Sequence, residues 1–136
     1  MKLTFQKAAL LNGINIVLKA VPSKTTMPIL ECILIDASTN EIKLTGNDME
    51  LGIETKVEGE ILEKGKIALD AKLFSEIVRK LADADAIVTI ESDEKFNTTI
   101  SGDNSVFKIQ GKDGEEFSYL KFIEKDKYIC LSHHHV

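Results

Sequence analysis

The chain has 136 residues, a hydrophobic fraction of 43% and a formal net charge of −5, values that fit one globular domain with a real core. The negative charge excludes a protein whose whole surface binds nucleic acid, because phosphate binding depends on Lys and Arg contacts. The most apolar stretch, 29–37, is interrupted by Glu31 and is too short to cross a bilayer. We therefore expect a soluble cytoplasmic protein that makes no membrane contact, and any contact with DNA must be local or weak.

The first half of the chain predicts the order strand, helix, strand, strand, strand. Polar and apolar residues alternate at the start, and apolar residues then recur at helical spacing as far as Ala20. Gly46 and Asn47 are typical turn residues between two of the strands. The predicted strands are 2–6, 29–37, 41–45 and 49–57, and the predicted helix is 8–20.

The second half repeats that order. When the halves are laid over one another at roughly sixty residues' separation, Leu3 falls on Ile67 and Leu10 on Phe74. The sequence thus predicts an α+β fold, a duplicated β-α-β-β-β unit with two helices packed on antiparallel sheets. The predicted strands of this half are 66–70, 86–91, 95–100 and 105–110, and the predicted helix is 73–81.

The pattern weakens after Asp113, where an extended segment with apolar anchors and a charged run at 124–127 indicate a linker. A new strand-like alternation starts at Tyr128 and is followed by histidines at 133–135. We expect a domain at 1–122, with a linker and the truncated start of the next domain at 123–136. We interpret the histidines as a tag remnant rather than a metal site, because no second cluster accompanies them.

Catalytic patterns are missing from the sequence. It contains no Gly-rich phosphate loop and no histidine before position 133, so no base for acid-base or nucleophilic chemistry is visible. Cys32 and Cys130 have neither metal-site nor disulfide-scaffold spacing, and we interpret them as buried free thiols. We expect a non-catalytic protein without metal or cofactor; a small acidic enzyme of unknown reaction is an alternative.

Several stretches resemble the N-terminal domain of the bacterial DNA sliding clamp, the beta subunit of DNA polymerase III. They are VLKAVPSKTTMPIL at 17–30, LTGND at 44–48, GEEF at 114–117 and the opening MKLTF. The resemblance implies the DNA clamp fold and a role in DNA replication as a processivity factor. Such a protein is a head-to-tail homodimer of three-domain subunits that encircles duplex DNA without sequence specificity.

The resemblance also implies two protein partners, the replicative polymerase and the clamp loader. The family's groove for polymerase peptides lies between the second and third domains, so this chain should lack it. An alternative function is a stand-alone clamp domain, an interaction or regulatory module that caps a clamp subunit.

The resemblance turns the polar faces of both helices toward the DNA, although a solvated helix face explains the same residues. Lys24 is the strongest single expected contact, because it precedes the TTMPIL segment where clamps place a DNA-touching side chain. Glu76 partly cancels the positive field of the second helix. The expected DNA-binding residues are Lys7, Asn15, Lys19, Lys24, Lys72, Arg79 and Lys80.

Phe107 and Ile109 lie in the last strand of the second unit. The resemblance places this strand at a domain edge that pairs with the third domain of the neighbouring subunit. We therefore expect Phe107 and Ile109 at the subunit interface, although core packing alone also explains Phe107.

Overall fold

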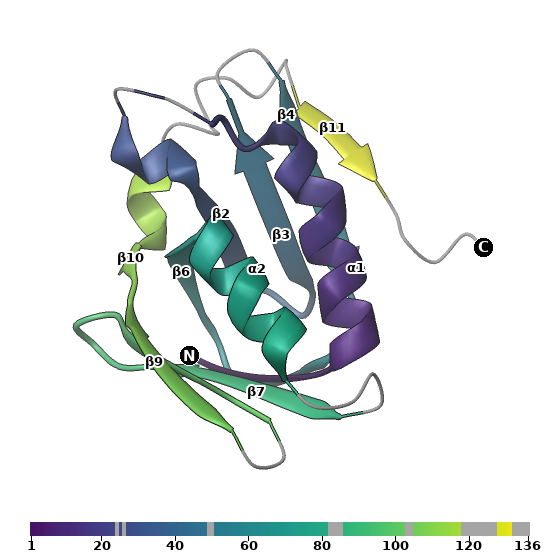
Figure 1. Ribbon diagram of the computed structural model, residues 1–136, viewed down its shortest axis with the longest axis vertical. Coiled ribbons are helices and arrows are strands. Elements are labelled where there is room, and N and C mark those ends of the chain that lie inside the picture. The colour runs from purple at the N-terminus through teal and green to yellow at the C-terminus, as the bar shows by residue number, and fades with distance from the viewer. Residues whose placement is uncertain are drawn as a thin grey trace.

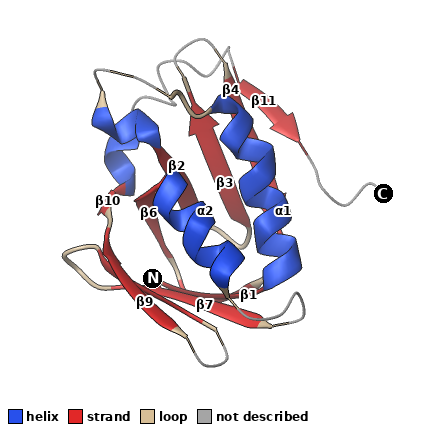
Figure 2. Cartoon of the chain, in the orientation of Figure 1, coloured by secondary structure: helices blue, strands red, loops and turns tan. Residues whose placement is uncertain are grey.

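Two main helices and two β-sheets make up the computed structural model, which describes residues 1–23, 25, 27–48, 51–81, 86–102 and 105–117 and the backbone of 128–131. Figures 1 and 2 show the two main helices side by side in front of the strands of one sheet, with strands of the other sheet below them. The helices are α1 (Lys7–Val17), α2 (Ala71–Lys80) and the short 3-10 helices η1 (Leu18–Ala20) and η2 (Pro28–Glu31). The strands are β1 (Lys2–Gln6), β2 (Cys32–Ala37), β3 (Ile42–Asn47), β4 (Gly52–Val57), β5 (Glu60–Glu63), β6 (Gly65–Asp70), β7 (Ile87–Ser92), β8 (Asn97–Ser101), β9 (Val106–Gln110), β10 (Lys112–Asp113) and β11 (Tyr128–Leu131).

Each repeat unit gives its first strand to the sheet of the other unit. The smaller sheet has the order β5-β1-β7-β8-β9, and the larger has the order β10-β6-β2-β3-β4-β11. In the first sheet Leu3 pairs with Ile90, and in the second Ile33 pairs with Leu69. All four side chains are fully buried, so the exchange lies in the centre of the core.

The helices cover the inner faces of the sheets because each carries one apolar stripe. In α1 the buried residues Leu10, Gly13, Ile14 and Val17 recur at spacings of three, one and three, the pattern of an amphipathic helix. In α2, Phe74 and Val78 occupy the positions equivalent to Leu10 and Ile14. One cluster of buried apolar side chains therefore joins both helices to both sheets, and the predicted duplicated α+β fold is confirmed.

The structure differs from the predicted elements in several places. The segment predicted to begin a strand at Ile29 is first the 3-10 helix η2 and becomes strand at Cys32. Gly46 and Asn47, predicted as turn residues, instead end β3 and pair with β4. The four-residue strand β5 was not predicted, because its short sequence EILE shows little alternation.

A small satellite core holds the end of the described domain in place. Phe117 is fully buried, as are Leu30 and Leu34, against which it packs. The segment predicted to be extended is thus helical over 114–117. The predicted domain boundary at residue 122 and the charged run at 124–127 lie outside the described residues.

The outer edges of the two sheets differ in whether a further strand pairs with them. Strand β11 pairs in parallel with β4, with Tyr128 opposite Gly52 and Leu131 opposite Thr55, as the yellow arrow in Figure 1 shows. Strand β9 pairs with β8 on one side, and no described strand pairs with its other side. The edge of β9 is therefore open to a strand from elsewhere.

Gly46 should tolerate no side chain. A Cβ built on it would lie 2.5 Å from the carbonyl oxygen of Val17, a backbone atom, whereas at its counterpart Gly102 the nearest atom is the flexible Cδ2 of Leu81 at 3.1 Å. We expect Gly46→Ala to lower the free energy of unfolding by about 1–3 kcal/mol and Gly102→Ala to change it by less than about 1 kcal/mol. Urea titration measures both, and equal effects would contradict the close approach of α1 to β3.

Candidate nucleic-acid interface

The exposed residues of the two helices are mostly polar, and the surface they form is here called the helical face. They lie on the sides of α1 and α2 that turn away from the buried stripes. Its members are Ala8, Asn12, Asn15 and Lys19 from α1 and η1, and Lys72, Leu73, Glu76, Arg79 and Lys80 from α2.

The helical face is positive although the chain is negative. It carries four cationic side chains, while Glu76 is the only acidic residue of α1 and α2 among the 22 of a chain with net charge −5. The remaining acidic residues lie in the strands, loops and other segments. The fold thereby separates charge, so an anionic ligand is attracted to the helices and repelled from the rest of the surface.

Three of the predicted cations are available for a ligand. Lys19, Lys72 and Lys80 are exposed, and their side chains make no ion pair or hydrogen bond within the described part of the chain. A free ammonium group on a flexible stem suits loose phosphate contact without fixed geometry.

Lys7, by contrast, is engaged inside the protein. Its Nζ donates hydrogen bonds to the carbonyl oxygens of Arg79, at 3.2 Å, and Leu81. The Arg79 carbonyl belongs to the last turn of α2 and that of Leu81 follows directly after it, at a helix end where oxygens lack helical partners and the dipole favours a cation. Hydrogen bonds to a charged group are worth about 1.5–3 kcal/mol when buried and less where water competes. Lys7 therefore ties the start of α1 to the end of α2.

A second polar link joins the helices on the helical face. Arg79 donates from Nη2 to Oδ1 of Asn15 at 3.1 Å. The structure thus brings three of the predicted DNA-binding residues into contact with protein groups, and leaves Lys19, Lys72 and Lys80 free. Lys24 lies outside the described residues, and its role stays a prediction.

The predicted interface residues point inward. Phe107 and Ile109 are partly buried and pack on the main core, whereas Val106 on the opposite face of β9 is 63% exposed. The strand is at a sheet edge, as predicted, but what it offers to a partner is its backbone and its outer side chains.

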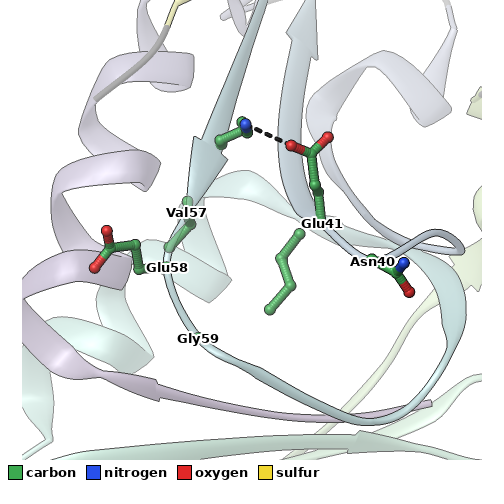
Figure 3. Close-up of a pocket in the computed structure, with 7 residues that line it drawn as sticks. Asn40, Glu41, Val57, Glu58 and Gly59 are labelled. Carbon is green, nitrogen blue, oxygen red and sulfur yellow. Dashed lines mark ion pairs between the residues drawn. The ribbon is translucent and has the colours of Figure 1, made fainter. Parts of the chain in front are cut away.

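A shallow pocket of about 560 Å³ opens between the ends of β3 and β4. Figure 3 shows Glu41 turned toward the neighbouring strand, where it pairs with Lys56. This contact lowers the pKa of the Glu41 carboxyl below its usual value, and the hydrogen bond from Lys56 is the largest cause. The ion pair occupies two of the three charged groups that line the pocket, and the third is the carboxylate of Glu58.

Neither a metal centre nor a membrane-spanning helix is present among the described residues. They contain no group of three or more His, Cys, Asp or Glu residues that could hold a metal ion. None of their helices is long and apolar enough to cross a membrane.

Comparison with known proteins identifies the domain. A family model described as the DNA polymerase III beta subunit, N-terminal domain, matches residues 1–121. The chain belongs to this family. The beta sliding clamp of Bacillus subtilis is 41% identical over 139 residues, covering 96% of this chain and 36% of the clamp. That of Staphylococcus epidermidis is 36% identical over 140 residues, covering 97% and 37%.

Solved structures agree with this assignment. A DNA polymerase III beta subunit from Eubacterium rectale matches with a TM-score of 0.84 and 66% identity, covering 88% of this chain and 32% of that one. The sliding clamp from Bacillus subtilis matches with a TM-score of 0.80 and 38% identity, covering 86% and 32%. The predicted family and clamp fold are confirmed, and so is the non-catalytic class, since the family consists of accessory subunits. The chain spans about a third of the length of these relatives.

Sequence reasoning missed that Lys7 caps α2. Lys7 lies 72 and 74 residues from its two acceptors, a separation that no periodic pattern reports. The one available signal was that Lys7 is a cation at the start of a helix, where the helix dipole disfavours positive charge. A cation at such a position is explained if its side chain binds another group.

Cys32 is the one cysteine whose side chain the structure describes. It is 2% exposed, and burial, followed by the nearby carboxylates of Asp70, Glu31 and Glu116, raises the pKa of its thiol from 9.0 to about 11, despite the opposing charge of Lys112. The protonated thiol is thus favoured in the folded state. Its contribution to stability is complete below about pH 9 and is lost as the pH rises toward 11.

We expect Cys32 to resist thiol reagents in the folded protein. In a Cys130→Ser variant at pH 8, 5,5′-dithiobis(2-nitrobenzoate) should label it at least about a hundredfold more slowly than in urea, because burial blocks access and a pKa near 11 suppresses the thiolate. Absorbance of the released thiol measures the rate, with Cys32→Ser/Cys130→Ser as the blank. Equally fast labelling with and without urea would refute the described burial.

Proposed function

We propose that this chain is the first domain of a cytoplasmic DNA sliding clamp, whose helical face contacts the phosphates of duplex DNA. The observation that carries the proposal is the positive helical face on a chain of net charge −5. Its free cations Lys19, Lys72 and Lys80 suit sequence-independent contact, because lysines on flexible stems fix no base geometry. Lys24 joins them as a proposed contact.

The proposed mechanism is topological. A closed ring cannot leave the duplex sideways, so the domain needs little intrinsic affinity, and a few weak phosphate contacts let the ring slide. In the complete protein we propose a head-to-tail homodimer that holds the replicative polymerase on DNA and is opened by a clamp loader. Because one domain supplies about a third of each subunit, the polymerase and the clamp loader act on the complete ring.

The proposed subunit interface is the open edge of β9. Edge strands add to a neighbouring sheet through backbone hydrogen bonds, and β9 has no described partner on its outer side. Phe107 and Ile109 would support this interface from within the core, by fixing the strand's position, while Val106 contacts the partner.

A second candidate function is favoured by the pairing of β11 with β4. That pairing covers one long sheet edge of the chain and leaves β9 as the other. A domain with one open long edge adds to a clamp subunit in one direction and ends the assembly there. We propose such a capping module as the alternative to a ring segment.

DNA binding by the 136-residue chain tests the first proposal. We expect Lys19→Met/Lys72→Met/Lys80→Met to lower the affinity for a random duplex and to reduce the slope of log affinity against log salt by about three, one for each lysine that no longer binds a phosphate. A charge-matched control, Lys64→Met/Lys95→Met/Lys112→Met, removes exposed lysines outside the helical face and should keep the slope. NMR titration at several salt concentrations measures both; equal slopes in the two variants would refute the helical face as the DNA site.

Association with a complete clamp tests the edge. We expect the chain to bind the Bacillus subtilis clamp in sedimentation velocity, and Val106→Lys to weaken this by roughly tenfold or more, because a charge on an edge strand opposes pairing. Ile87→Lys is the control, since Ile87 is also exposed, at 51%, but lies in the inner strand β7. No complex with the unmodified chain would remove the capping alternative.

A further inference from the structure

The two helices are joined by polar side chains at two levels. At the first level Nζ of Lys7 reaches the carbonyls of Arg79 and Leu81 at the end of α2. At the second, the guanidinium of Arg79 reaches Asn15, two turns farther along α1. Arg79 takes part in both, with its carbonyl and with its side chain.

Lys7 contacts the chain before β7 as well as the end of α2. Its backbone N–H donates to the carbonyl of Ala86 at 2.9 Å, directly before β7, while its side chain holds Leu81, directly after α2. One residue therefore fixes the chain on both sides of 82–85, and sets where α2 ends relative to the sheet that β1 and β7 share.

A phosphate contact would compete with these bonds. The half-buried ammonium of Lys7 already donates two of its three hydrogens to carbonyl oxygens, and turning it toward a phosphate would leave the last turn of α2 without those donors. Lys19, Lys72 and Lys80 face no such conflict. The cations near the two helices thus fall into two classes, engaged and free.

We infer that Lys7, Asn15 and Arg79 are positioning residues, which set the spacing of α1 and α2 and so the distance between the free cations on the two helices. This inference rests on the proposed DNA contact by the helical face. It changes the expected role of Lys7 and Asn15 from touching DNA to orienting the residues that do. Arg79 acts in the same way through its bond to Asn15.

The test compares Lys7→Met with Lys19→Met in the 136-residue chain. Methionine keeps much of the apolar stem and removes the charge. We expect Lys7→Met to weaken duplex binding severalfold with an unchanged salt slope, because the free cations are displaced but all of them remain. Lys19→Met should reduce the slope by about one. Lys7→Arg, which restores a long cationic donor, should recover most of the affinity.

Three results would overturn the inference. A slope reduced by about one in Lys7→Met would make Lys7 a direct phosphate contact. If Lys7→Met is fully folded and its affinity for duplex DNA is unchanged, the link between the helices stabilises the fold but does not position the DNA contacts. If the unmodified chain binds no duplex even at low salt, the proposed function fails first. The helix link is then judged separately by NMR, where Lys7→Met must shift the amide signals of the last turn of α2.

A double-mutant cycle tests the second level. If Asn15 acts only by holding Arg79, Asn15→Ala should weaken DNA binding severalfold in the unmodified chain and have no further effect in an Arg79→Met background. If Asn15 touches DNA itself, its removal should weaken binding equally in both backgrounds, which would contradict the positioning role. Asn40→Ala, which removes an exposed asparagine outside the helical face, is the control and should leave binding unchanged.

Discussion

The exchange of first strands between the two repeat units is the constraint on which the rest of this domain depends. β1 completes the sheet of β7, β8 and β9, and β6 completes that of β2, β3 and β4. Neither unit has a full sheet without the other, so the core is built from contacts between distant parts of the chain, and folding must overcome the loop-closure entropy of both exchanges. Because each helix follows directly on an exchanged strand, α1 and α2 are brought together over one core and present one exposed surface.

Periodicity in the sequence was enough to predict the duplicated α+β fold but not the exchange of first strands, and the reasons for its failures are physical. The spacing of Leu10 and Ile14 marks the buried side of a helix whatever the position of the sheets. The helix and its equivalent in the second unit were therefore predicted. Gly46 looked like a turn residue because glycine is common in turns, but here it lacks a side chain so that α1 can approach β3. The helical face was predicted as well. The link from Lys7 to α2 was not, since it depends on how the two units pack.

The sheet edges follow the general need to prevent unwanted pairing. In the larger sheet the edge strand β10 has only two residues, and in the smaller sheet the edge strand β5 carries Glu60 and Glu63. The β4 edge pairs with β11. Only β9 combines five residues with an outer side that no described strand covers, and on its exposed face the apolar Val106 lies two residues from the charged Lys108. An edge of this kind is costly to leave exposed, which favours its use as an interface.

The distribution of charge fits the DNA contact proposed for the helical face, a surface that attracts DNA without holding it. Free cations on flexible stems give an attraction that depends on salt and ignores sequence, and Glu76 limits its strength. If Lys7 and Arg79 were also free, the affinity would rise and movement along the duplex would slow. Their bonds to carbonyl and amide oxygens use the charge for a different purpose: they hold the helices at a fixed spacing, so that a few weak contacts act together. On this view rigidity between the helices and weakness toward DNA have the same origin, the division of the cations into engaged and free.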